Sequence, residues 1–317
     1  MPIGIPNRPS TLNLGHGTDT IVKLVQGGTE PPLIMLHSKS EFHFYLVPEL
    51  TMLKSLFTTG FWAIQVTPDA PLHSIPAQAE FYFEKIKEEQ PRGPYRLAAV
   101  SATSIVLVEL ARIFEAQGDS VIQLAFIDHF PSLLICPEIG IQGDQEYPLD
   151  DPRTRRAFIT NSFHSAATFL RNDGYGTSQK RRKQTQMLLA AFYGGEPTNH
   201  FAKINTSVME RYLGAVFDFL VSMAADRVEP TELMATLAAW LGSVRAVRAV
   251  AQVYIASTGV VLEVPPQHRL EWADLGARKC IEHPRVVFLE GGHFEILSNP
   301  ELVRGLQAGF TLVEAKL

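Results

Sequence analysis

The sequence predicts an α/β fold with a mainly parallel central sheet, helices on both faces and a long helical insertion. Strand-like and helix-like segments alternate as far as Pro131, and this rhythm is typical of parallel strands joined by helical crossovers. Some of the strand-like segments are continuously apolar, which favours a sheet covered on both faces. The 317 residues are 46% hydrophobic and 19% charged, enough for one large core or a core with an inserted subdomain.

Seven segments have the composition of strands, five before Pro131 and two near the C-terminus. Leu33–His37 is an uninterrupted apolar run, as expected for a strand with both faces buried. Prolines close the strand that begins at Phe61. The expected strands are Thr20–Val25, Leu33–His37, Phe61–Val66, Tyr95–Val100, Val121–Ile127, Val253–Ala256 and Arg285–Leu289.

Helical spacing fills the intervals between these strands. In Ile75–Glu89, Ala79, Phe83 and Ile86 form one apolar stripe with charged residues opposite. Gly118 is placed as a helix stop signal. The expected helices are Phe44–Phe57, Ile75–Glu89, Ser104–Gln117, Thr154–Leu170, Gln179–Tyr193, Ser207–Ala224, Glu232–Ala251 and Glu301–Phe310.

This pattern divides the chain into three parts. Residues 1–15 are rich in proline, glycine and asparagine and are expected to be a flexible N-terminal segment. Residues 16–131 and 252–317 form the predicted α/β core. Residues 132–251 are helical in tendency and form a predicted lid subdomain over the carboxyl edge of the sheet.

Composition excludes several classes of function. The net charge of −5 is too balanced to favour nucleic acid or a membrane surface as a partner. The start of the chain has no secretory signal pattern, and no apolar run approaches the ~20 residues of a membrane span. Cys136 and Cys280 are far apart, without zinc or redox spacing. We therefore expect a soluble, cytoplasmic protein, and no pattern calls for a metal or organic cofactor.

Ser101 is the first candidate for chemistry. It follows an apolar strand and directly precedes a helical pattern, the layout of a nucleophile elbow, in which a tight turn holds a serine hydroxyl above an α/β sheet. The usual form is G-x-S-x-G, whereas Ala99 and Thr103 occupy the two glycine positions here. A serine before a helix can also be an ordinary N-cap, so the serine alone does not decide the function.

An acid and a base complete the pattern. Asp128 ends the strand after the elbow, and His293 lies in a glycine-rich turn after the last strand. The order Ser, Asp, His is the one that α/β-hydrolases use. Each residue also has a simpler interpretation, Asp128 as a turn former and His293 as a loop histidine.

Other residues are weaker candidates for these roles. His129 is next to the acid and is expected to point the other way, and His37 is expected to make structural hydrogen bonds. The later strand Val253–Ala256 has no following carboxylate before Glu263, so Asp128 is the preferred acid.

Residues 65–75 and 90–97, together with the sequence from Glu290 to His293, resemble the thioesterase domain that ends animal fatty acid synthase. They are also similar to the related domains of polyketide synthases and nonribosomal peptide synthetases, all α/β-hydrolases. The resemblance covers about Thr20–Pro131 and about Val253–Phe310. In between, the family carries a helical lid of variable sequence.

The resemblance implies release of an acyl chain from a phosphopantetheine thioester, by water or by an internal nucleophile. Ser101, Asp128 and His293 would be catalytic. The oxyanion hole would use the backbone N–H of Ala102 and a second donor from Lys39 or Ser38. The implied partner is an acyl carrier protein or an acyl-CoA, within or beside a megasynthase.

Two other functions stay open at this point. The altered elbow is compatible with a weak or inactive acyl-binding protein of the same fold. So is the sequence His37–Glu41, where the family typically has His-Pro followed shortly by glycine. A serine esterase or acyltransferase acting on small or lipid substrates would use the same three residues.

Overall fold

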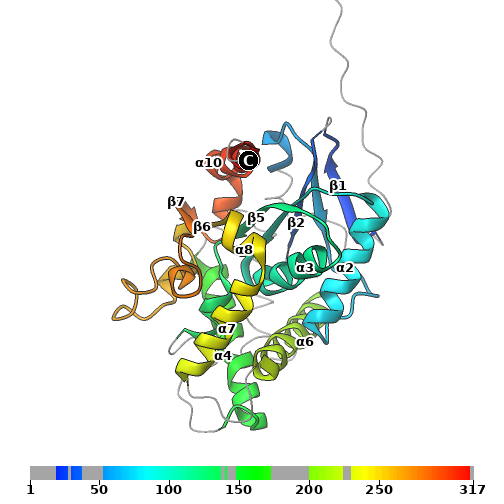
Figure 1. Ribbon diagram of the computed structural model, residues 1–317. Helices are drawn as coiled ribbons and strands as arrows, with labels where there is room; N and C mark the ends of the chain where they lie inside the picture. Colours follow the sequence, from blue (N-terminus) through cyan, green and yellow to red (C-terminus); the bar gives the residue numbers. More distant parts are fainter. Residues whose placement is uncertain are drawn as a thin grey trace, which may run out of the picture.

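The central sheet has seven strands in the order β1-β3-β2-β4-β5-β6-β7, and it is parallel except for β1 (Figure 1). The computed structural model describes residues 19–27, 30–37, 53–136, 140, 148–172, 200–223 and 230–314. The predicted α/β fold class is confirmed. The strands are β1 (Ile21–Val25), β2 (Leu33–Leu36), β3 (Phe61–Ile64), β4 (Tyr95–Val100), β5 (Val121–Ile127), β6 (Ala251–Thr258) and β7 (Arg285–Gly292).

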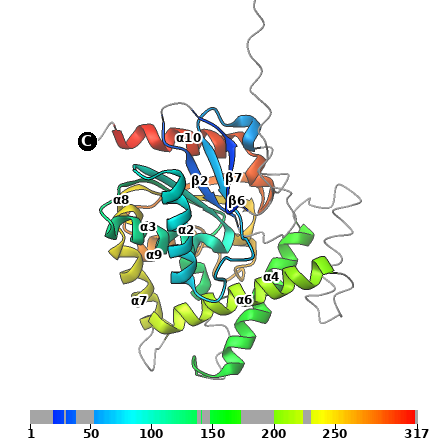
Figure 2. The ribbon, with the colours of Figure 1, turned by 90° about the vertical axis from the view of Figure 1, so that its right-hand side faces the viewer.

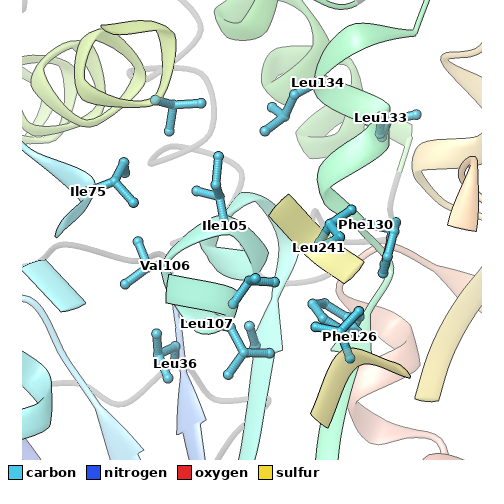
Figure 3. Close-up of a cluster of buried hydrophobic side chains, with 14 of the residues drawn as sticks. Leu36, Ile75, Ile105, Val106, Leu107, Phe126, Phe130, Leu133, Leu134 and Leu241 are labelled. Carbon is cyan, nitrogen blue, oxygen red and sulfur yellow. The ribbon is translucent and has the colours of Figure 1, made fainter. Parts of the chain in front are cut away.

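The central strands are buried on both faces, and their side chains alternate between two apolar clusters. In β2, Ile34 and Leu36 join one cluster while Leu33 and Met35 join the other. The same alternation holds along β4, β5 and β6, because successive side chains of a strand point to opposite faces. Figure 3 shows part of the larger cluster, in which Leu36 of β2 lies together with Val106 and Leu107 of the helix that follows β4. This two-sided burial is why the strand sequences are almost continuously apolar.

Helices cover both faces. The face with the larger cluster carries α2 (Ile75–Glu89) and α3 (Ser104–Ala116), which pack against each other, and the other face carries α10 (Pro300–Glu314) (Figure 1). α2 begins at the predicted residue, Ile75. Ser74 caps it, because the N–H of Ala77 donates to Oγ of Ser74 at 3.4 Å. At the end of α3, Gly118 has a φ of +79°, which suits the stop signal expected there.

Helices also fill the described part of the interval between β5 and β6. They are α4 (Pro152–Asn172), α6 (His200–Met223), α7 (Pro230–Ser243) and α8 (Arg245–Val250). In Figure 2, α4 and α6 cross below α2. The predicted helix Gln179–Tyr193 and the predicted N-terminal segment 1–15 lie outside the described residues. The proposed division into core and lid stays a prediction.

One predicted helix, Glu232–Ala251, was wrong as a single element. It ends at Ser243, Val244 is extended, and a new helix, α8, starts at Arg245. The carboxylate of Glu115 on α3 accepts the N–H groups of Arg245 and Ala246 at 2.8 and 2.7 Å and so caps the second helix. Ala251 belongs to β6. A distant acid therefore decides a boundary that local spacing does not reveal.

The remaining differences are short helices that were not predicted, such as α9 (Ala277–Cys280), and shifts at element ends. β6 and β7 are longer than predicted, and β7 extends to Gly292, next to His293. Of the predicted helix Phe44–Phe57, the described residues begin at Leu53 and are helical to Leu56. Within the described ranges, no helix is both long and apolar enough to span a bilayer.

Candidate active site

Ser101 lies in a strained turn between β4 and α3. Its φ is +59°, in the left-handed region, and the short 3-10 helix η1 (Ser101–Thr103) joins the strand to the helix. A non-glycine residue in this region costs about 1–3 kcal/mol and is seen mainly where function requires it. The strand, tight turn and helix predicted for a nucleophile elbow are therefore present.

The two residues that replace the elbow glycines fit without disrupting this turn. Ala99 is fully buried in regular β4. The hydroxyl of Thr103 donates to the carbonyl of Val100 at 2.7 Å, and the carbonyl of Leu36 is 3.4 Å away. A bond of this kind stabilises a structure by about 1 kcal/mol. Thr103 therefore ties the turn back to the ends of two strands.

Asp128 and His293 form a buried hydrogen-bonded pair. Asp128 Oδ2 is 2.7 Å from His293 Nδ1, and the two side chains are 0% and 3% exposed. Asp128 itself has a φ of +48°, and its backbone N–H donates to the carbonyl of Tyr254 at 2.7 Å. Two residues 165 positions apart in the sequence thus meet in the interior.

The end of β6 and the loop after it hold the carboxylate of Asp128 on its other sides. The N–H of Ala256 donates to Oδ1 at 2.9 Å, and the N–H of Val260 donates to Oδ2 at 3.0 Å. Gly259 lies against the same group, because a Cβ built on it would be 2.1 Å from Oδ2. A glycine is required there to let backbone approach the carboxylate.

The sheet register places Ser101 beside this pair. Val100 is paired with Ile127 on the neighbouring parallel strand, so Ser101 and Asp128 are the next residues on adjacent strands. His293 directly follows β7. Because the carboxyl ends of parallel strands meet at one edge of the sheet, all three residues lie at that edge, as predicted.

A second serine–histidine pair lies next to the first cluster. Oγ of Ser104, the first residue of α3, is 2.8 Å from Nδ1 of His129, and both side chains are buried. Burial, and secondarily the charge of His293, lowers the pKa of His129 to about 3. His129 is therefore neutral near pH 7. It is hydrogen bonded to the helix, whereas His293 is the histidine that contacts Asp128.

The oxyanion residues expected from the sequence are only partly described. Ala102 lies in η1 directly after Ser101, while Ser38 and Lys39 lie outside the described residues. His37 directly follows β2 and is buried. Glu263, the alternative acid, caps a short 3-10 helix after β6.

Tyr212 of α6 reaches the same turn from the helical insertion. Its Oη donates to the backbone carbonyl of Ala102 at 2.8 Å. The sequence pattern did not predict that Tyr212, Gly259 and the Ser104–His129 pair lie at this site. The glycine in the short loop after the sixth strand was the only available signal, and its meaning depends on the carboxylate that it faces.

Comparison with known proteins identifies the family. A family model described as the thioesterase domain matches residues 57–309. The highly reducing polyketide synthase stpks1 of Strobilurus tenacellus is 32% identical over 287 residues, which are 88% of this chain and 10% of that synthase. Polyketide synthase PksR of Bacillus subtilis is 36% identical over 72 residues, 22% of this chain and 3% of that protein. The chain thus spans about a tenth, or less, of the length of these relatives.

Solved structures show the same fold at low sequence identity. YbtT, a type II thioesterase of the yersiniabactin pathway, has a TM-score of 0.51 at 13% identity, covering 92% of this chain and 99% of YbtT. Haloalkane dehalogenase DbeA of Bradyrhizobium elkani has a TM-score of 0.52 at 14% identity, covering 94% and 95%. The family resemblance read from the sequence is therefore confirmed: this chain belongs to the thioesterase-domain family, of the type found in polyketide synthases and nonribosomal peptide synthetases, with an α/β-hydrolase fold.

Proposed function

We propose that this chain is a serine thioesterase that releases an acyl or polyketide chain from the phosphopantetheine arm of a carrier, with Ser101, His293 and Asp128 as its catalytic triad. One observation carries the proposal. The buried Asp128–His293 hydrogen bond lies at the same sheet edge as Ser101, whose backbone is held in the left-handed region. A catalytic serine and its base need this arrangement, in which a third group orients the base.

The contacts of Asp128 support its role as the group that orients His293. The carboxylate accepts two backbone N–H groups, from Ala256 and Val260, in addition to the bond with His293. These two backbone bonds hold the carboxylate beside Nδ1 of His293, so Nδ1 is the nitrogen that donates to Asp128. Nε2 is then the nitrogen with a lone pair to accept the proton of a serine.

The reaction then follows in two halves. Oγ of Ser101 attacks the thioester carbonyl carbon while His293 accepts the hydroxyl proton, and the backbone N–H of Ala102 stabilises the oxyanion. The C–S bond breaks, and the thiol leaves with the proton from His293. Water, or a hydroxyl of the acyl chain itself, then attacks the acyl-enzyme with His293 again as base. The first nucleophile gives a free acid and the second a cyclic ester.

The setting of the elbow favours an active enzyme over an inactive acyl-binding protein. Thr103 and Ala99 are accommodated with good packing, and Ser101 keeps the strained conformation that an elbow needs. The relatedness to polyketide synthases favours a carrier-bound thioester over an oxygen ester, and a megasynthase is the proposed source of the substrate.

A fluorophosphonate probe tests the nucleophile. We expect the intact protein to be labelled, Ser101→Ala to lose all labelling, and Ser104→Ala, a serine three residues away, to remain labelled. Absence of labelling in the intact protein would contradict the serine mechanism and favour the acyl-binding alternative.

Substrate comparison tests the reaction. Hydrolysis rates should rank acyl groups on a phosphopantetheine carrier or its N-acetylcysteamine mimic above matched oxygen esters. Acyl-CoA measures whether the carrier protein itself is needed. Faster turnover of the oxygen esters would replace the thioesterase proposal with the esterase alternative.

A further inference from the structure

The helical insertion makes a direct hydrogen bond to the turn that carries the proposed nucleophile. Tyr212 on α6 donates its phenol proton to the carbonyl oxygen of Ala102, and the two residues are 110 positions apart in the sequence. Burial, and secondarily the neighbouring Tyr82, raises the pKa of Tyr212 above its ordinary value. The phenol is therefore protonated near neutral pH and can donate.

The turn that receives this bond is short, and Thr103 ties it to the strand ends on one side. η1 is three residues long and begins with Ser101 at a φ of +59°. The N–H of Ser104, at the start of α3, donates to the carbonyls of Ala102 and Ser101, so bonds from α3 and from α6 meet on the Ala102 oxygen. Strained conformations persist only where the surroundings hold them.

Apolar packing sets the position of Tyr212 above the turn. One helical turn before it, Val208 is buried against Ala70 and Leu72. On the other side, Leu213 and Val216 are buried in the larger core cluster. α6 also contacts α2, and Figure 2 shows it crossing below that helix. The hydrogen bond is therefore made by a helix that is seated on both sides of the tyrosine.

We propose that Tyr212 is a positioning residue that ties α6 to the oxyanion turn, so that the seating of this helix sets the orientation of the Ala102 amide. The inference rests on the proposed serine mechanism, since it assigns Tyr212 a role through Ala102. The carbonyl that Tyr212 binds and the amide that would bind the oxyanion belong to the same residue. The N–H lies in the Ser101–Ala102 peptide and the carbonyl in the Ala102–Thr103 peptide. The two peptides are joined at Cα of Ala102, so a rotation of one moves the other.

Tyr212→Phe tests this role, with Tyr95→Phe as a matched control. Tyr95 also donates its phenol proton to a backbone carbonyl, that of Gln90, at 2.8 Å, but at the opposite end of β4. Both substitutions remove one phenol hydrogen bond and keep the ring. The two variants should therefore lose similar thermal stability, and only Tyr212→Phe should alter chemistry at Ser101.

Two kinetic measurements separate positioning from a purely structural role. We expect Tyr212→Phe to lower kcat for a thioester on the order of 10-fold with KM nearly unchanged, a smaller effect than the 10²–10³-fold loss of an oxyanion donor itself. Phosphonylation of Ser101 by the fluorophosphonate should slow by a similar factor, because it also develops charge in the oxyanion hole. Tyr95→Phe should match the intact protein in both measurements.

A second variant guards against misfolding of the first. Val208→Ala keeps the phenol and loosens the docking of α6 next to it, and it should slow phosphonylation by a smaller factor. If the intact protein is labelled and both variants are labelled at its rate, the inference about Tyr212 is wrong while the serine mechanism stands. A rise in KM alone would also overturn it. If the intact protein is not labelled at all, the proposed function fails and the inference with it.

Discussion

The two ends of the central strands carry buried polar clusters that differ in backbone conformation, which is regular at one end and strained at the other. At the amino ends lies the Arg96 network, which consists of Arg96, Gln123, Gln252 and Tyr254 from β4, β5 and β6. At the carboxyl ends lies the triad cluster of Ser101, Asp128 and His293. Both clusters remove polar groups from water, so both require hydrogen-bond partners.

In the Arg96 network, the guanidinium donates to neutral oxygens from regular strand and helix positions. The Nε of Arg96 donates to Gln123 at 2.9 Å, and its Nη2 donates to the carbonyl of Leu306 at 2.9 Å. Gln123 also donates to that carbonyl at 2.7 Å, which fixes α10 to the sheet. Burial lowers the pKa of Arg96 to about 10. These contacts stabilise the fold.

The triad cluster instead keeps two residues in the left-handed region, Ser101 and Asp128. Here the hydrogen bonds hold a strained geometry that places a hydroxyl and an imidazole at the sheet edge. One sheet is thus stabilised at one end and strained at the other, and the strained end is where the chemistry is expected.

Ser101→Gly should give the largest effect on activity and an opposite effect on stability. Loss of the nucleophile should lower thioesterase activity by on the order of 10⁴-fold or more. Glycine adopts a φ of +59° without steric cost, so the free energy of unfolding should rise by about 0.5–1 kcal/mol. Urea unfolding beside a thioester assay measures both. Lower stability in this variant would show that the elbow is not strained.

Gly259→Ala should have the next largest effect on activity. The added Cβ would be 2.1 Å from Oδ2 of Asp128, so the carboxylate or the loop must move. A displacement of this size at a catalytic group costs on the order of 10²-fold in kcat. Gly242→Ala is the matched control, because a Cβ at Gly242 meets nothing within 4 Å. Equal activity of both variants would remove Asp128 from the mechanism.

Arg96→Met should break the other cluster. It leaves Oε1 of Gln123 without its Arg96 donor and removes one of the two side-chain donors to the carbonyl of Leu306, and we expect a loss of about 2–4 kcal/mol in the free energy of unfolding. Activity should stay within a few-fold of the intact protein at temperatures where the variant is folded. Arg92→Met, at an exposed position, should change stability by less than about 0.5 kcal/mol. A large fall in kcat with unchanged stability would reverse the assignment of this cluster.

His129→Gln changes a residue that lies at the carboxyl ends of the strands but is hydrogen bonded to α3. The pKa of His129 is about 3 in the folded protein, whereas an unperturbed histidine has a pKa of 6.5. Between these two pH values His129 is therefore protonated in the unfolded chain and neutral in the folded one. Stability is therefore lost as pH falls from about 6.5 towards 3, at up to about 1.4 kcal/mol per pH unit from this one group.

Urea unfolding at pH 7 and pH 5 checks this dependence. The variant should show a shallower loss of stability than the intact protein between these two pH values. His283→Gln, whose side chain is 89% exposed, should keep the original dependence. Parallel slopes for the intact protein and His129→Gln would mean that His129 is not held neutral by burial.

Most of the sheet and the three residues of the candidate site could be predicted from the sequence. β4 and β5 begin and end at the predicted residues, because strands buried on both faces leave a continuous apolar signal bounded by turns. Ser101, Asp128 and His293 could be grouped from their places alone. Each follows a strand, and parallel strands bring their carboxyl ends to one edge.

The break at Val244 and the need for Gly259 could not be predicted in this way. The first depends on Glu115, about 130 positions earlier, accepting two backbone N–H groups. The second depends on a carboxylate from another strand lying against the glycine. Local periodicity contains neither contact.

By itself, then, the sequence determined which residues form strands, which helices join them and which polar side chains stand at the strand ends, since these follow from burial and periodicity along the chain. Only the tertiary structure decided that Ser101 is held at a positive φ, that two backbone amides and His293 meet on Asp128, and that Tyr212 reaches Ala102. Those features depend on distances of a few ångströms between residues more than 100 positions apart, and such distances are fixed by the packing of the whole fold.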